Sequence, residues 1–423
     1  MSLTPLSDAR RRAAEAAAAL CGPGVDTPLD AAHGALLAAP VHALQSIPHA
    51  ATSAMDGWAI RGEGPWRPHD EAPSGPGSSE RTALSPVDPR PALEDGEAVA
   101  VVTGSPIPAG TTSVLRSEHA RLDQGSDGHR LLHADPGSED VEPGRHLRPS
   151  GSEAADGEVL LSSGERLTPA RAAMAAVAGH DTVLIHPLPR VRLICTGEEV
   201  ITSGLPGPGQ VRDAFEISVP AAVAAMGGRM AGVHRVGDDA SALTRRLREA
   251  IADGVGLVLT TGGTARSEAD ALRAALQDLG AEPLVDSVDM RPGHPAVLAR
   301  VGGTLVLGLP GNPLAGFAAL AALGQVALDA LRGVPAEAAV GLPRSTSSQP
   351  LEGARRGLRL LPVELHDDGV GPVGHDKPHM MRGLASADAF ALVPPGGLEA
   401  GATVEVLPLA WQAGSTPLSR RST

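Results

Sequence analysis

The chain has 423 residues, and at roughly 150 residues per domain this length predicts about three domains with several buried cores. A net charge of −14 argues against nucleic-acid binding, and two cysteines are too few for a disulfide framework or a zinc site. The sequence shows no signal peptide and no apolar run of the roughly 20 residues that a membrane span needs, so we expect a cytoplasmic protein without a membrane partner.

The N-terminal part predicts a helical start and then a β-rich region. An alanine-rich helix is expected over residues 7–20, and a second, short helix over residues 30–38. Short strands separated by turns follow over residues 97–161, and a small helix is expected over residues 168–178. Within this part, a turn at Asp56-Gly57 leads directly into a strand.

From residue 182 onward the pattern changes, because buried strands now alternate with helices. The expected strands include residues 191–197, 257–263 and 304–308, and the expected helices cover residues 214–226, 241–253, 269–279 and 314–331. This alternation predicts a doubly wound parallel sheet. Residues 343–408 return to short strands, which predicts a small β domain, and the polar tail 412–423 is expected to be disordered.

Two of these strands run straight into glycine-rich loops, LVLTTGG at residues 257–263 and TLVLGLPGNP at residues 304–313. A parallel strand that delivers such a loop to a helix N-terminus forms an anion pocket, because loop N–H groups and the helix dipole both face the ligand. The two loops therefore predict one crevice for a phosphate-bearing ligand. The alternative interpretations are a tight turn at the first loop and, at the second, a rigid helix start with Pro313 in the first position.

The segment RPGHP at residues 291–295 places a guanidinium, of Arg291, and an imidazole, of His294, on a turn that two prolines stiffen. Arginine is well suited to bind a phosphate or another oxyanion. An ordinary surface turn is the alternative interpretation of this segment.

Acidic and hydroxyl side chains also follow several apolar runs. Glu198 and Glu199 stand at the carboxyl end of a strand, where two acids suit a divalent cation, although one of them can instead cap the next turn. Asp56, Thr103 and Asp270 stand at turns of the same kind, and each alone is more often a turn or cap residue than a ligand.

Eight motifs occur along the chain in one order. They are SAMDGWAI (53–60), VVTGSPIPAG (101–110), GRHLRPSG (144–151), CTGEEV (195–200), GQVRD (209–213), TTGG with EAD (260–270), RPGHP (291–295) and GLPGNP (308–313). In order and spacing they resemble the molybdopterin molybdenumtransferases, the molybdenum insertases related to the catalytic E domain of gephyrin. The resemblance covers roughly residues 3–410, and eight short motifs in order are specific even though each alone is weak.

The resemblance implies an elongated α/β multidomain subunit. It assigns residues 1–45 with 146–180 to a helical linker domain, 46–145 to an inserted β-rich domain, 181–337 to a doubly wound, Rossmann-like molybdopterin-binding domain, and 338–411 to a small C-terminal β domain. It also implies a homodimer, with the active site between the doubly wound domain of one subunit and the inserted domain of the other. The related molybdopterin adenylyltransferase is a candidate partner.

The implied reaction inserts molybdate into adenylylated molybdopterin and releases AMP, with Mg²⁺ assisting. Catalytic roles fall on Asp56, Thr103, Glu199 and Asp270, of which Glu199 and Asp270 are the expected Mg²⁺ ligands. Substrate-binding roles fall on Arg148, Asp213, Gly262, Gly263, Thr264, Arg291, His294, Pro310, Asn312 and Pro313. In this division, cationic groups and loop N–H donors bind phosphates and molybdate, while acids bind the metal and orient attack at the adenylyl phosphorus.

Several residues of the implied cleft depart from the family's pattern, namely His294, Ala265, Ser267, Phe215, Ala315 and Lys377-Pro378. His294 stands in place of a lysine, and histidine is mostly neutral at pH 7. The alternative to an active insertase is therefore a catalytically degenerate paralogue that binds molybdopterin or the mature cofactor as a carrier or assembly factor. An adenylyltransferase is disfavoured, because single-domain adenylyltransferases lack the flanking domains.

Overall fold

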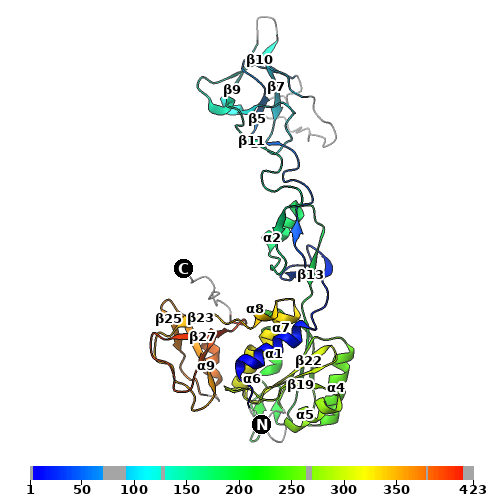
Figure 1. Ribbon diagram of the computed structural model, residues 1–423, viewed down its shortest axis with the longest axis vertical. Helices are drawn as coiled ribbons and strands as arrows, with labels where there is room; N and C mark the ends of the chain where they lie inside the picture. Colours follow the sequence, from blue (N-terminus) through cyan, green and yellow to red (C-terminus); the bar gives the residue numbers. More distant parts are fainter. Residues whose placement is uncertain (1–2, 70–91, 125–128, 263–268, 378–379, 413–423) are drawn as a thin grey trace.

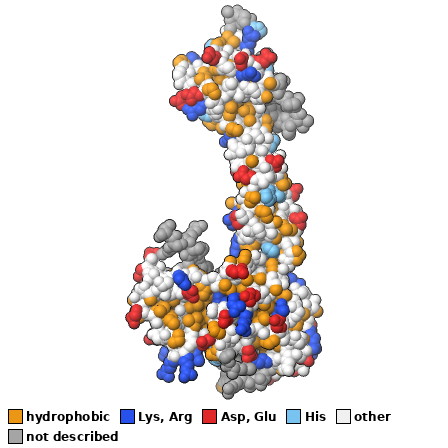
Figure 2. Space-filling model, viewed as in Figure 1, with side chains coloured by type: hydrophobic (Ala, Val, Ile, Leu, Met, Phe, Trp, Pro, Cys, Tyr) orange, Lys and Arg blue, Asp and Glu red, His pale blue; other side chains and the backbone are white. Residues whose placement is uncertain are grey.

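The computed structural model describes residues 3–69, 92–124, 129–262, 269–377 and 380–412, and shows an elongated molecule (Figure 1). A wide base contains α1 (Leu6–Ala18) and all elements from β14 onward. A slender middle body separates this base from a distal body formed by the elements β4 to β11, and Figure 2 shows the same narrow column between the two wider parts. The chain leaves the base after α1, reaches the distal body through the middle body, and returns the same way.

The distal body contains most of the predicted β-rich region, residues 97–161, although residues 159–161 belong to the middle body. Its sheet has the order β6-β7-β5-β8, formed by β6 (Arg67–Pro68), β7 (Glu97–Val101), β5 (Gly57–Ile60) and β8 (Ser113–Arg116). The remaining elements are β4 (Thr52–Ser53) paired with β11 (Leu147–Arg148), the hairpin β9 (Ala120–Gln124) and β10 (Arg130–Ala134), and the short turns η1 (Ser117–His119) and η2 (Glu139–Val141). Two tryptophans, Trp58 and Trp66, anchor its small core.

The middle body combines a helix with short strands. Its elements are β1 (Val25–Pro28), β2 (Leu36–Leu37), β3 (Val41–His42), β12 (Val159–Leu161), α2 (Pro169–Val177) and β13 (Thr182–His186). The expected helix α2 forms, with the Thr168 side chain as its N-cap. The prediction of a helix over residues 30–38 is wrong. Gly34 has a left-handed φ of 81°, which interrupts a helix, and Leu36 and Leu37 form a buried strand paired with β13.

The base contains the predicted doubly wound sheet, in the strand order β17-β14-β18-β22-β21-β19. Its strands are β14 (Arg190–Cys195), β17 (Arg229–Arg235), β18 (Leu257–Thr261), β19 (Glu282–Val285), β21 (Val297–Val301) and β22 (Thr304–Leu309). The first four strands in this order are parallel, as predicted. However, β21 runs antiparallel to both of its neighbours, because the two-residue turn Gly302-Gly303 joins it to β22 as a hairpin.

Side chains alternate between two cores along the central strands. Leu193 of β14 faces the larger core and Ile194 the smaller one, as the two-residue period of a strand requires. The larger core includes α1, α3 (Phe215–Ala225), α6 (Pro313–Ala319), the π-turn Leu320–Gly324 and α7 (Gln325–Leu331), and the smaller one includes α4 (Ala240–Ala252) and α5 (Ala269–Asp278). Helices thus cover both faces of the sheet (Figure 1).

The helical stretch Pro313–Leu331 is long and apolar enough to cross a membrane by length and composition alone. In the structure, 89% of its most apolar window is buried within the protein. A helix that is apolar all round is expected in the centre of a large core, and this one takes that position between the sheet and α1.

The N-terminal helix α1 packs on the base, although the sequence assigns its residues to the linker domain. Its contacts are with α7, with α8 (Ala336–Ala339) and with β19. Ala9, Ala13 and Ala17 are fully buried, and these small side chains let α1 approach α7 closely. The exact boundaries of the four domains stay predictions.

The C-terminal sheet has the order β20-β24-β26-β27-β23, with β25 paired to β24. Its elements are β20 (Met290–Arg291), β23 (Arg344–Thr346), β24 (Leu358–His366), β25 (Gly369–Pro372), β26 (Ala389–Val393) and β27 (Thr403–Pro408), with α9 (Met381–Ser386) beside them. The short strand β20 precedes the RPGHP turn and ties that turn to the C-terminal sheet. Gln412 is fixed by hydrogen bonds to the carbonyls of Leu384 and Ala387, and the rest of the expected disordered tail lies outside the described residues.

A buried arginine on α1 offers a test of how this helix is attached. The Arg10 guanidinium donates hydrogen bonds to the carbonyls of Ala322, Ala339 and Val340, and burial lowers its pKa to about 10. Arg10→Met should lower the free energy of unfolding of the base by roughly 2 kcal/mol, because buried carbonyls lose their charged donor. Arg11→Met is the matched control: Arg11 is exposed, and its ion pairs contribute little. Chemical denaturation measures both, and equal stability of the two variants would contradict the prediction.

Candidate active site

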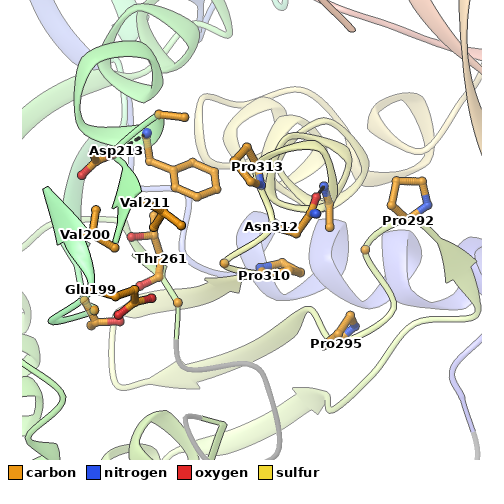
Figure 3. Close-up of a pocket in the computed structure, with 18 of the residues that line it drawn as sticks. Glu199, Val200, Val211, Asp213, Thr261, Pro292, Pro295, Pro310, Asn312 and Pro313 are labelled. Atoms are coloured by element: carbon orange, nitrogen blue, oxygen red, sulfur yellow. Dashed lines mark hydrogen bonds between the residues drawn. The ribbon is translucent and has the colours of Figure 1, made fainter. Parts of the chain in front are cut away.

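A cavity of about 710 Å³ lies at the carboxyl ends of β14, β18 and β22. Its walls come from five segments, residues 196–200, 211–215, 261–262, 291–295 and 310–315 (Figure 3). The strand β14 lies between β17, which follows it in the chain, and β18, which comes next. The chain therefore reverses its direction across the sheet at β14, and the cavity lies at this point. Such a switch point is the usual ligand position in a doubly wound sheet.

The two glycine-rich loops meet in this cavity, which confirms the predicted single crevice. Thr261 at the end of β18 stands opposite Leu309 at the end of β22. A Cβ atom on Gly311 would lie only 3.6 Å from the Cα atom of Gly262, and one on Gly262 would lie 2.6 Å from Thr196 Oγ1. Because Gly262 also has a φ of 78°, only glycine suits this position. Gly263 and Thr264, like Ala265 and Ser267, lie outside the described residues.

Asn312 starts the helix that follows the second loop. Its Oδ1 atom accepts a hydrogen bond from the Ala315 N–H at 3.1 Å, and Pro313 occupies the first helical turn. The side chain of Asn312 is thus a helix cap, which agrees with the alternative interpretation of this loop as a rigid helix start. Pro310, Asn312 and Pro313 also line the cavity (Figure 3).

Asp213 caps the other helix that begins at the cavity. Its Oδ1 atom accepts hydrogen bonds from the N–H groups of Phe215 (2.7 Å) and Glu216 (3.0 Å). Its Oδ2 atom pairs with Arg235, which also binds Glu216 at 2.8 Å. Only 5% of the Asp213 side chain is exposed, so this carboxylate shapes the cavity wall while its oxygens are engaged within the protein.

The structure separates the two adjacent glutamates. Glu199 lines the cavity, whereas Glu198 turns toward the loop after β17, where its N–H donates to Asp238. Asp270 is the second residue of α5, and its side chain lies outside the description. Among the described residues no group of three or more His, Cys, Asp or Glu side chains could hold a metal ion, so the Mg²⁺ ligands stay a prediction.

Arg291 and His294 line the wall next to α6, on the turn that follows β20. Partial burial lowers the pKa of His294 below its ordinary value, and the positive charge of Arg291 lowers it further. Both effects favour the neutral form of His294, so Arg291 is the permanent positive charge of this turn.

The other predicted site residues lie in the distal body, away from the cavity. Asp56 and Thr103 are brought together, since Asp56 Oδ1 accepts hydrogen bonds from the Thr103 N–H (2.7 Å) and hydroxyl (2.9 Å). Both residues are exposed. Arg148 is in β11, opposite Thr52. The middle body lies between these residues and the cavity of the same chain (Figure 1).

Some cavity residues were not expected from the sequence. Arg212 adds a second positive side chain to the wall, and its position beside Asp213 in the GQVRD motif is the signal that could have identified it. Thr196 links the ends of two strands, because its hydroxyl donates to the Thr261 carbonyl at 2.6 Å. Phe215, expected only as a departure from the family's pattern, also lines the cavity.

Three family models match successive parts of the chain. They are the MoeA N-terminal region (domain I and II) over residues 4–179, the probable molybdopterin binding domain over residues 192–332, and the MoeA C-terminal region (domain IV) over residues 346–409. All residues that line the cavity fall within the second of these matches.

Relatives and solved structures agree with these matches. Molybdopterin molybdenumtransferase 2 of Mycobacterium tuberculosis is 29% identical, covering 91% of this chain and 94% of its own length. The molybdopterin molybdenumtransferase of Synechococcus elongatus is 31% identical, covering 66% of this chain and 68% of its own. A crystal structure of a molybdopterin biosynthesis MoeA protein from Pyrococcus horikoshii has the same fold, with a TM-score of 0.74 at 22% identity over 96% of this chain and 99% of that one. The chain therefore belongs to the MoeA family of molybdopterin molybdenumtransferases.

Proposed function

We propose that this protein transfers molybdenum onto molybdopterin in molybdenum cofactor biosynthesis. The observation that carries the proposal is the cavity at the switch point of the doubly wound sheet, inside the segment that matches a molybdopterin-binding model. Its volume of about 710 Å³ is within the range of pockets that enclose a small organic ligand. We infer that adenylylated molybdopterin and molybdate are the substrates and that AMP is released. The reaction suits the cytoplasm, and the adenylyltransferase that makes the substrate is a candidate partner.

The charges around the cavity indicate how such a ligand lies. The helix start at α3 carries the negative carboxylate of Asp213, whereas the start at α6 carries the neutral amide of Asn312. A negative group on a ligand is therefore favoured beside α6 and Arg291 rather than beside α3. Figure 3 shows Asp213 and Glu199 on one side of the cavity and the Pro292–Pro295 turn on the other. We infer that molybdate, and those phosphate oxygens that do not bind the metal, lie on the α6 side.

We propose that a magnesium ion binds beside Glu199, on the side of the cavity opposite the Pro292–Pro295 turn. Mg²⁺ commonly takes one or two carboxylates, several waters and substrate phosphate oxygens. Glu199 lines the cavity, and Asp270 begins the helix that follows the first glycine-rich loop. We propose these two residues as ligands, and a metal held there would neutralise charge that develops at the adenylyl phosphate.

We further propose that two copies of the chain form each active site. Asp56, Thr103 and Arg148 lie in the distal body, and the cavity lies in the base. A second copy packed in the opposite direction would bring its distal body to this cavity and would receive the same contribution in return, as two-fold symmetry requires.

A carrier or assembly factor without turnover is the second candidate function. The neutral imidazole of His294 favours it, because an uncharged group binds an oxyanion more weakly than a cation does. A measurement of AMP release distinguishes the two candidate functions, because a carrier would bind the pterin without releasing AMP.

The purified protein with Mg²⁺ should release AMP from adenylylated molybdopterin only when molybdate is present. Asp56→Ala should lower this release by roughly a hundredfold or more, the size expected for loss of a group that acts in the reaction. Asp95→Ala is the matched control, because Asp95 is an exposed carboxylate of the same distal body. Chromatographic measurement of AMP is the readout, and pterin binding without molybdate-dependent release would support the carrier function instead.

Mixing two inactive variants tests the shared site. Asp56→Ala and Glu199→Gln should each be inactive alone, but unfolding and refolding them together at equal amounts should restore about a quarter of wild-type AMP release. Half of the dimers are then mixed, and each mixed dimer contains one site with both residues intact. No recovery, with refolded wild type active, would contradict a site shared between copies.

Molybdate binding should depend on the charge of His294. In the wild type, affinity for molybdate should rise as the pH falls below the ordinary histidine pKa of about 6.5, because only the protonated imidazole is a cation. His294→Lys should remove this dependence and bind molybdate about three- to tenfold more tightly at neutral pH. Calorimetric titration with molybdate measures both effects, with His294→Gln as the uncharged control. A wild-type affinity that does not change with pH would contradict the prediction.

A further inference from the structure

A buried carboxylate in the distal body binds two residues that flank the Asp56 loop. Asp140, in η2, is 2% exposed. Its Oδ2 atom accepts hydrogen bonds from the Arg116 N–H (3.2 Å) and Nε (3.0 Å) and lies 3.0 Å from His119 Nδ1, and its Oδ1 atom lies 2.8 Å from His146 Nε2. Burial alone would raise the pKa of Asp140, but the hydrogen bonds from Arg116 and His146 hold it well below its usual range.

Two of the three partners of Asp140, Arg116 and His146, connect to the backbone around Asp56. The residue after Arg116 is Ser117, whose N–H donates to the Asp56 carbonyl at 3.1 Å. The carbonyl of His146 accepts a hydrogen bond from the Ala54 N–H at 2.8 Å. His146 has a left-handed φ of 57°, which is uncommon for histidine and needs support from its surroundings. Asp140 thus fixes contacts on both sides of the loop.

The loop in turn presents the Asp56 carboxylate at the surface, where it accepts both hydrogen bonds from Thr103. We propose that Asp140 is a positioning residue for the Asp56–Thr103 pair. It acts through Arg116 and His146, and it fixes the direction in which the Asp56 carboxylate points from the surface of the distal body. This inference rests on the proposed function, because that function assigns the pair to the reaction.

The test compares Asp140→Asn with Glu139→Gln. Glu139 is the preceding residue, and its carboxylate is 71% exposed and paired with Arg145 at the surface. Asp140→Asn should lower kcat for AMP release by roughly ten- to a hundredfold, the cost of a misplaced reacting group. The KM for both substrates should change much less than kcat, since most of the proposed substrate-binding residues line the cavity in the base. Glu139→Gln should change neither quantity.

Amide hydrogen exchange supplies a readout that does not require activity. In Asp140→Asn, exchange at the N–H groups of Ala54, Ser117 and Thr103 should become at least tenfold faster, while the thermal transition of the base is unchanged. If the wild type releases no AMP, the proposed function fails, and exchange at these three amides alone decides whether Asp140 positions the loop. Unchanged exchange overturns the proposal.

A double variant separates positioning from general destabilisation. If Asp140 acts through Asp56, adding Asp140→Asn to Asp56→Asn should lower kcat no further, because the two residues act as one unit. A further tenfold loss would overturn the proposal. If Asp140→Asn does not fold, His146→Asn replaces it, because asparagine tolerates the left-handed backbone but is too short to keep the contact at 2.8 Å. In His146→Asn, hydrogen exchange at the Ala54 N–H should become faster, and an exchange rate equal to that of the wild type would likewise overturn the proposal.

Discussion

The parallel pairing of β14, β18 and β22 is the constraint on which the cavity depends. Cys195 is paired with Thr261, and Thr261 with Leu309, so the three strands end at one level and their loops begin side by side. Buried residues fill both faces of these strands, and a shift of one residue would exchange the two sets. The packing of both cores therefore fixes the register, and the register brings Gly262 and Gly311 so close that a Cβ atom on Gly311 would touch Gly262.

The side chains that start the helices at the cavity also set its charge. Asp213 and Asn312 have the same structural role, because each accepts a hydrogen bond from the first turn of a helix. They differ in charge, and on this difference rests our proposal that an anionic group of the ligand is favoured beside α6 rather than beside α3. The fold and the proposed polarity of the site thus depend on the same two residues.

The sequence is most informative where structure is local. The βα alternation and the two glycine-rich loops are readable because hydrophobic periodicity and turn chemistry depend on neighbouring residues. The packing of α1 on α7, the transfer of β20 to the C-terminal sheet and the strand at Leu36 are not readable, since each depends on a partner far along the chain. For the site, motifs identified several cavity residues, whereas the expectation that Asp56 and Glu199 lie in different domains came from the family resemblance and not from spacing.

The slender middle body has a mechanical consequence. It is joined to the base at one end and carries the whole distal body at the other (Figure 1). In such a lever, a small rotation at the junction moves the far end much more than it moves residues beside the junction. In the dimer that we propose, the stiffness of the small core around Leu37, Leu167 and Ile185 therefore governs how accurately the distal residues reach the cavity of the second copy, although no residue of that core lines the cavity.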